Sequence, residues 1–118
     1  MMTIYIFALV DETTGEVLLS LPKDSAVTRD PLFPKKAQVE VPQKYICRMM
    51  RLFEMSLLDF RGRQAKTTYG LFENSLVRLT DSNFKFLDEP SDAEMKSKLT
   101  ELFIMGQQFP KGIWEIKL

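Results

Sequence analysis

The sequence contains no histidine and a single cysteine, Cys47, among its 118 residues. Without histidine, the chain lacks the usual base that activates a serine or cysteine nucleophile, and it lacks a common zinc ligand. One cysteine cannot form a disulfide within the chain, although small secreted domains usually depend on such bridges. These absences favour a non-catalytic protein of the reducing cytoplasm that holds no metal and no other cofactor.

Glycine is scarce too, and the five glycines lie too far apart to form a phosphate-binding loop of the GxGxxG or Walker type. Net charge is absent, because 16 basic side chains are balanced by 16 acidic ones. The chain as a whole therefore has no electrostatic attraction for nucleic acid or anionic lipid. The apolar run at residues 3–10 is too short to cross a bilayer and lacks the basic flank of a signal peptide. We expect no membrane association.

Apolar residues are plentiful, since 45% of the sequence is hydrophobic. A chain of this length buries roughly 65% of the surface that its unfolded form exposes, which suits a single domain over residues 1–118. Residues 3–10 are apolar at odd and even positions alike, which predicts a central strand covered on both faces. A turn ending in glycine leads to a second strand at residues 17–21, and three prolines in residues 22–36 predict a long irregular loop.

Helical periodicity is clearest in residues 43–60, where we expect one amphipathic helix after a short edge strand at residues 38–41. Pro42 suits the first position of that helix. The side chains expected to face the core are Tyr45, Ile46, Met49, Met50, Leu52, Phe53, Leu57 and Phe60. Cys47 is interpreted as a small packing residue on the flank of the helix. The helix should end near residues 61–63, and an irregular segment should follow at residues 64–70.

A second hairpin is predicted from the β-prone segments at residues 76–80 and 84–87, which a short polar connection joins at residues 81–83. At the end of the chain, residues 114–118 alternate between apolar and charged side chains, as in a strand with one buried face.

Ser91 and Glu94 match the Ser-x-x-Glu capping box, so a second helix should begin there and end near Gly106, before a turn at residues 109–112. The expected fold is therefore α+β. A mainly antiparallel sheet, built from two hairpins and a C-terminal strand, should pack against two helices in a single domain.

Charge is unevenly distributed along the chain, although its sum is zero. Residues 44–66 contain six basic and two acidic residues, whereas residues 88–101 contain five acidic and two basic ones. Lys44, Arg48 and Arg51 should form a basic stripe opposite the core-facing side of the first helix. This stripe could bind a partner, remain solvated, or pair with the acidic C-terminal helix within the molecule.

Met55 and Leu58 interrupt that basic stripe with apolar surface. Arginine, methionine and apolar side chains together are typical of protein interfaces, although another element of the fold could equally cover these two residues. We predict a small non-catalytic binding factor, such as an inhibitor, immunity protein, adaptor or assembly component, whose size would suit a phage or mobile-element protein. The residues expected to contact another protein are Lys44, Arg48, Arg51, Met55, Leu58, Arg61, Arg63 and Lys66.

Two alternatives use different chemistry. The same basic stretch could bind the phosphates of a nucleic acid, and such binding would weaken steeply with salt. Glu115 and Lys117 also resemble a fragment of the carboxylate-lysine motif of Mg²⁺-dependent nucleases, in which Asp81 or Asp88 would have to supply the missing metal ligand.

Overall fold

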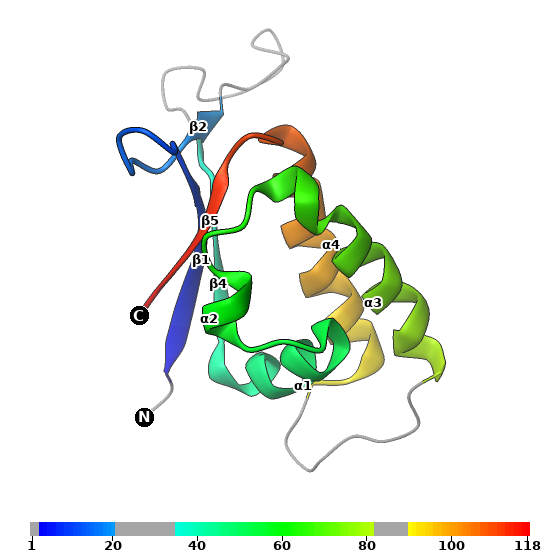
Figure 1. Cartoon of the computed structure of the whole chain (residues 1–118). Helices are drawn as coiled ribbons and strands as arrows, with labels where there is room; N and C mark the ends of the chain where they lie inside the picture. Colours follow the sequence, from blue (N-terminus) through cyan, green and yellow to red (C-terminus); the bar gives the residue numbers. More distant parts are fainter. Residues whose placement is uncertain (1–2, 21–34, 82–89) are drawn as a thin grey trace, which may run out of the picture.

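The computed structural model describes residues 3–20, 35–81 and 90–118 (Figure 1). Strands β1 (Ile4–Val10), β4 (Gln38–Pro42) and β5 (Ile113–Lys117) form a three-stranded antiparallel sheet in the order β4-β1-β5. Strands β2 (Leu19–Ser20) and β3 (Lys35–Lys36) form a separate two-stranded ladder. Helices cover one face of the larger sheet (Figure 1). The α+β class, the central position of β1 and the edge position of β4 are confirmed.

The first hairpin is only partly formed. After β1, the chain turns around Asp11, whose carboxylate accepts the N–H groups of Thr13 and Thr14 at 2.8 and 3.0 Å. These bonds lower the pKa of Asp11, that from Thr14 most. A bridge between Val10 and Val17 then returns the chain to β1, but β2 leaves it and pairs with β3. Leu21 and the predicted loop up to residue 34 lie outside the described residues.

The prediction of a single helix at residues 43–60 is wrong, because the structure has two helices there, α1 (Gln43–Phe53) and α2 (Leu57–Phe60). Glu54 ends α1 with a left-handed backbone at a φ of 59°. Ser56 then begins α2, and its side-chain oxygen accepts the N–H of Asp59 at 3.3 Å. The break keeps the apolar face in register with the core, since Phe53 and Phe60 stack with ring centroids 5.2 Å apart.

The strained backbone at Glu54 gives a prediction about stability. An L-residue in the left-handed region costs roughly 1–2 kcal/mol that glycine avoids. Glu54→Gly and Glu54→Ala both remove the exposed ion pair with Arg78 at 3.0 Å, so the comparison between them isolates the backbone. We expect Glu54→Gly to be more stable than Glu54→Ala by about 1 kcal/mol in urea unfolding. An alanine variant as stable as the glycine variant would contradict this account.

The predicted second hairpin is also wrong, because residues 76–80 belong to helix α3 (Tyr69–Asp81). Phe72, Ser75 and Leu79 are buried at helical spacing, which lets α3 pack against α1 and against helix α4 (Asp92–Gln108). Helical packing thus outweighs the β propensity of this segment. Residues 84–87, the other half of that hairpin, lie outside the described residues.

The capping box at Ser91 and Glu94 is confirmed at the start of α4. Gly106, in contrast, does not end this helix, which continues to Gln108. The glycine is buried where helix and core meet: a Cβ placed on it would lie 3.6 Å from the ring of Trp114. A Cβ at this distance would make ordinary van der Waals contact, and the turn at residues 109–112 follows as expected.

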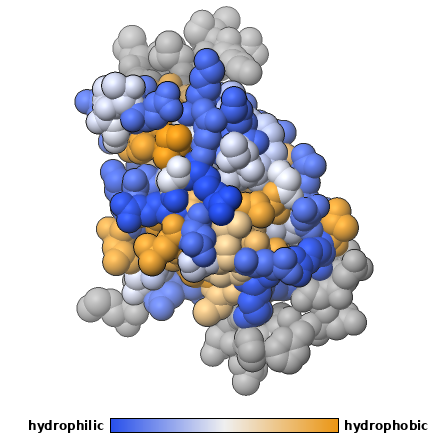
Figure 2. Space-filling model, viewed as in Figure 1, coloured by the Kyte–Doolittle hydropathy of each residue, from blue (hydrophilic) through white to orange (hydrophobic). Residues whose placement is uncertain are grey.

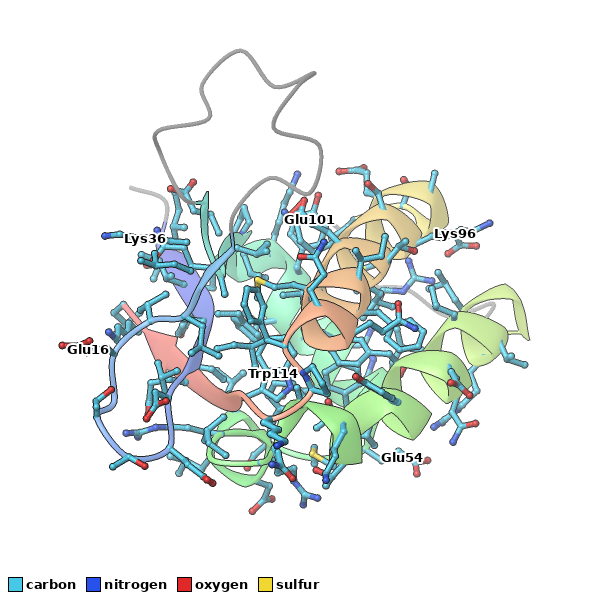
Figure 3. The ribbon with its side chains drawn as sticks, turned by 90° about the horizontal axis from the view of Figure 1, so that it is seen from above. Glu16, Lys36, Glu54, Lys96, Glu101 and Trp114 are labelled. Atoms are coloured by element: carbon cyan, nitrogen blue, oxygen red, sulfur yellow. The ribbon has the colours of Figure 1, made fainter. Side chains whose placement is uncertain are left out.

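Trp114 lies between the sheet and the helices, near the middle of the molecule (Figure 3). The buried residues around it include Phe7 from β1, Phe60 from α2 and Phe72 from α3. A short 3₁₀ turn, η1 (Ala65–Thr68), lies beside this cluster and leads directly into α3, where irregular chain had been expected. No helix in the described ranges is long and apolar enough to span a membrane.

Candidate partner-binding surface

The eight residues predicted to contact a partner differ widely in how exposed they are in the structure. Arg48 is buried, whereas Leu58 is among the most exposed apolar residues, with 78% of its surface accessible. Met55 is half-buried and packs against the core. The cations that remain exposed are Lys44, Arg51, Arg61, Arg63 and Lys66.

The predicted exposure of Arg48 on the outer side of the helix is wrong. Only 2% of its surface is accessible, and its guanidinium lies against the start of α4. One N–H donates to the carbonyl of Pro90 at 2.9 Å, and Nη2 forms an ion pair with Asp92. The Nε atom is buried and has no hydrogen-bond partner among the described residues. Arg48 therefore joins α1 to α4 and does not belong to a docking surface in the folded protein.

The basic and acidic stretches meet in space. Besides the pair between Arg48 and Asp92, Lys44 Nζ lies 3.5 Å from Glu94 Oε2. Glu94 thus accepts from Lys44 and from the capping residue Ser91, and these contacts, chiefly the backbone N–H of Ser91, lower the pKa of Glu94. Lys44 and Arg48 therefore pair within the molecule with the C-terminal helix α4. This was one of the alternatives left open by the sequence. Asp88 and Glu89 of the acidic stretch lie outside the described residues.

The chain after α2 follows the outer edge of β5. Gly62 donates its N–H to the carbonyl of Trp114 at 2.8 Å, and Trp114 donates its N–H to the carbonyl of Arg63 at 2.9 Å. The side chain of Arg61 pairs with Glu115 on β5. These bonds hold the predicted Arg-rich turn against the sheet and cover an edge that would otherwise expose free backbone groups.

A shallow groove of about 180 Å³ lies between α2 and the adjoining ends of β1 and β5. Its lining is mainly apolar with cations at the rim: Tyr5, Leu57, Leu58, Arg61, Ile116, Lys117 and Leu118. Figure 2 shows apolar surface among hydrophilic residues where α2 and the end of β5 lie. We call these seven residues the α2 groove.

No protein-family model, no curated protein and no solved structure matches the chain. Function therefore has to be argued from the geometry of the chain itself.

The sequence anticipated Leu58 and Arg61 but not the other residues of the α2 groove. Tyr5 stands more than a hundred positions before Ile116, and antiparallel pairing of β1 with β5 brings the two strands together. The available signal was the alternation in residues 114–118, which placed Ile116 and Leu118 on the same side of a strand. The alternation could not show that the surface on this side of β5 extends past the end of the core and onto α2.

A larger groove of about 340 Å³ separates β4 from the C-terminal half of α4. Ile104, which is 49% exposed, and Met105 line its helical wall. Beside this groove, Lys98 donates from Nζ to the backbone carbonyl of Glu40 at 3.0 Å. The ammonium group of Lys98 thus donates to an outward-facing backbone carbonyl of the edge strand β4. This contact hinders pairing of β4 with another strand.

Of the residues proposed for metal-dependent cleavage, only Glu115 and Lys117 have side chains that the structure describes. Glu115 pairs with Arg61, while Asp88 and the side chain of Asp81 lie outside what the structure describes. Residues 3–20, 35–81 and 90–118 contain no group of three or more cysteine, aspartate or glutamate side chains that could hold a metal ion. Cys47, interpreted as a packing residue, is exposed on α1.

Proposed function

We propose that this protein is a small non-catalytic binding factor, an inhibitor, immunity protein, adaptor or assembly component, that docks another protein through the α2 groove. The observation that carries the proposal is Leu58, a leucine left 78% exposed on a short helix beside an apolar depression. Arg61 and Lys117 flank the depression, so its centre is apolar and its rim polar. This is the composition of many protein interfaces.

The size of the groove favours a protein partner over a small molecule. Pockets that enclose a drug-sized ligand or cofactor usually hold roughly 300–1,000 Å³. At about 180 Å³, the α2 groove is better suited to one anchoring side chain from a partner's surface. Covering Leu58 would add roughly 1.5–3 kcal/mol of hydrophobic stabilisation, enough to make it an energetic centre of the interface.

Nucleic-acid binding through the same stretch has less support from the geometry. Of its basic residues, Arg48 is buried, Lys44 pairs with Glu94, and Arg61 pairs with Glu115. Three of the six cations are therefore already opposed by carboxylates of the same chain. Affinity for the phosphate backbone depends on the number of cations that are available to neutralise it.

Leu58→Asp should lower affinity for the partner by about ten- to a hundredfold, since it removes an apolar anchor and places a charge in the interface. Val77→Asp is the matched control, because Val77 is also exposed, at 66%, but lies on α3. A photo-crosslinking amino acid at each position would identify the partner from host lysate, and titration of the purified pair would measure affinity.

The proposal predicts crosslinking to a protein from position 58 and unchanged affinity for the Val77→Asp variant. Equal affinity of both variants would refute the role of the α2 groove. Retention of nucleic acid with strong salt dependence would support the second function instead. Mg²⁺-dependent cleavage that is lost in Glu115→Gln would support the third.

A further inference from the structure

The face of the sheet opposite the helices carries a row of three side chains with complementary ends. In the antiparallel register, Ile6 of β1 lies opposite Glu40 of β4 on one side and opposite Lys117 of β5 on the other. We infer that two copies of this chain associate through this face, with Ile6 packing on Ile6 and Glu40 pairing with Lys117 of the second copy.

Side-chain alternation places all three residues on that face. Phe7 and Val41, next to Ile6 and Glu40 in the chain, and Trp114, three positions before Lys117, are buried on the helix side of the same strands, and side chains an odd number of positions apart on a strand lie on opposite faces. Figure 1 shows the helices on the other side of the sheet. Glu40 and Lys117 are both exposed, so the two ends of this row meet solvent in the single chain.

The centre of the face is apolar. Ile4 and Ile6 follow one another along its middle strand; Ile4, the first residue of β1, is 41% exposed and Ile6 is half-buried, whereas Ala8, the next residue on this face, is fully buried. The flanking strands supply the charge, with Glu40 on β4 and Lys117 on β5. An apolar centre between charged margins is the pattern of an association surface.

The charges favour a second copy as the occupant. A two-fold axis parallel to the strands and midway between two facing sheets exchanges the β4 side with the β5 side. It would place each Glu40 over a Lys117 of the other copy while Ile4 and Ile6 meet their own equivalents. Sheets packed in this way lie about 10 Å apart, a spacing that these side chains can fill.

The charges at the two margins are available for such pairing. Neither Glu40 nor Lys117 forms a side-chain ion pair with another residue in the described ranges, whereas Glu115, also on this face, is already paired with Arg61. Because the face is isologous, each copy would contribute one carboxylate and one ammonium, which gives two equivalent pairs per dimer.

Charge reversal tests the inference directly. Glu40→Lys or Lys117→Glu alone would replace both attractive pairs by repulsive ones, and each should raise the dimer dissociation constant roughly tenfold or more. The double variant Glu40→Lys with Lys117→Glu restores opposite charges across the interface and should recover the dissociation constant of the unmodified chain. Sedimentation equilibrium over a range of protein concentrations would measure all four proteins.

Circular dichroism and urea unfolding would show that each variant keeps its fold. Glu16→Lys, a reversal on the exposed turn before β2, is the matched control and should leave dimerisation unchanged. A chain that stays monomeric at high micromolar concentration would overturn the inference. Dimers that tolerate either single reversal, or that the double variant fails to restore, would also overturn it. Lys117 also lines the α2 groove, so Glu40→Lys, at a residue outside that groove, is the variant that keeps this result separate from the docking proposed above.

Discussion

Arg48→Ala should lower the free energy of unfolding by about 3 kcal/mol, although the periodicity of the sequence places this arginine on the outer side of its helix. The loss has three physical sources. The charge-assisted bond to the Pro90 carbonyl disappears, the ion pair with Asp92 disappears, and the space of a side chain only 2% exposed is left unfilled. Asp92 remains 60% exposed and can be rehydrated, which limits the cost.

Two matched variants separate these sources in urea denaturation. Arg48→Met keeps most of the apolar stem and removes the buried Nε, which has no partner among the described residues. This variant should therefore lose less free energy of unfolding than Arg48→Ala. Lys44→Ala removes the neighbouring pair with Glu94, in which both side chains are 47% exposed, and should change stability by no more than about 0.5 kcal/mol. If Lys44→Ala cost as much as Arg48→Ala, the structural role of Arg48 would be refuted.

This result bears on any test of function. A charge reversal at Arg48 would place a carboxylate beside Asp92 in a site that now holds a buried cation. Such a variant would lose binding because it unfolds, not because a contact is missing. Variants at Leu58 and Arg61 are therefore the proper probes of the proposed docking surface.

Trp114→Ala should cost about 4 kcal/mol, the largest loss that we expect from a single substitution. The indole is fully buried, and its ring centroid lies 5.3 Å from that of Phe60 and 6.0 Å from that of Phe72. Its N–H donates to the hydroxyl of Thr68 at 3.0 Å. One side chain thus connects β5 with α2, α3 and the 3₁₀ turn. Thermal unfolding followed by circular dichroism would measure the loss.

The contribution of the buried hydrogen bond can be separated from that of packing. Thr68→Val leaves the indole N–H without an acceptor and should cost about 1–3 kcal/mol. Trp114→Phe removes the donor and part of the ring, and in this background Thr68→Val should cost about 1 kcal/mol less than it does alone. Purely additive effects of the two substitutions would show that the bond contributes little. Trp114 is the only tryptophan, so its fluorescence also reports folding in the Thr68→Val protein.

Short-range patterns in the sequence predicted several elements correctly. The continuous apolar character of β1 indicated a central strand, and the alternation at residues 114–118 indicated β5. Ser91 and Glu94 indicated the start of α4 because the capping box satisfies backbone donors within a single turn. The apolar side of α1 was also correct, since Met49, Leu52 and Phe53 are buried. Each of these signals depends on residues within a few positions of one another.

Errors occurred where distant residues compete with local preference. Residues 76–80 have β-branched and apolar character, yet contacts with α1 and α4 stabilise them as part of α3. The helix break at Glu54 carries no glycine or proline signal; it allows Phe60 to reach Phe53 and Trp114 in the core. Gly106 resembled a helix stop, but α4 continues past it to Gln108, and the glycine is buried within the helix.

By itself, the sequence determined the class of the fold and the ends of its clearest elements, because hydrophobic period, caps and turns act over a few residues. Its lack of histidine also excluded histidine-based catalysis and metal ligation by histidine. Only the tertiary structure decided which charges are free. It buried Arg48 against Asp92, paired Lys44 with Glu94, and left Leu58 exposed beside Ile116. Partners as far as 58 positions apart in the chain make these contacts, and no local pattern specifies which distant residue will lie opposite.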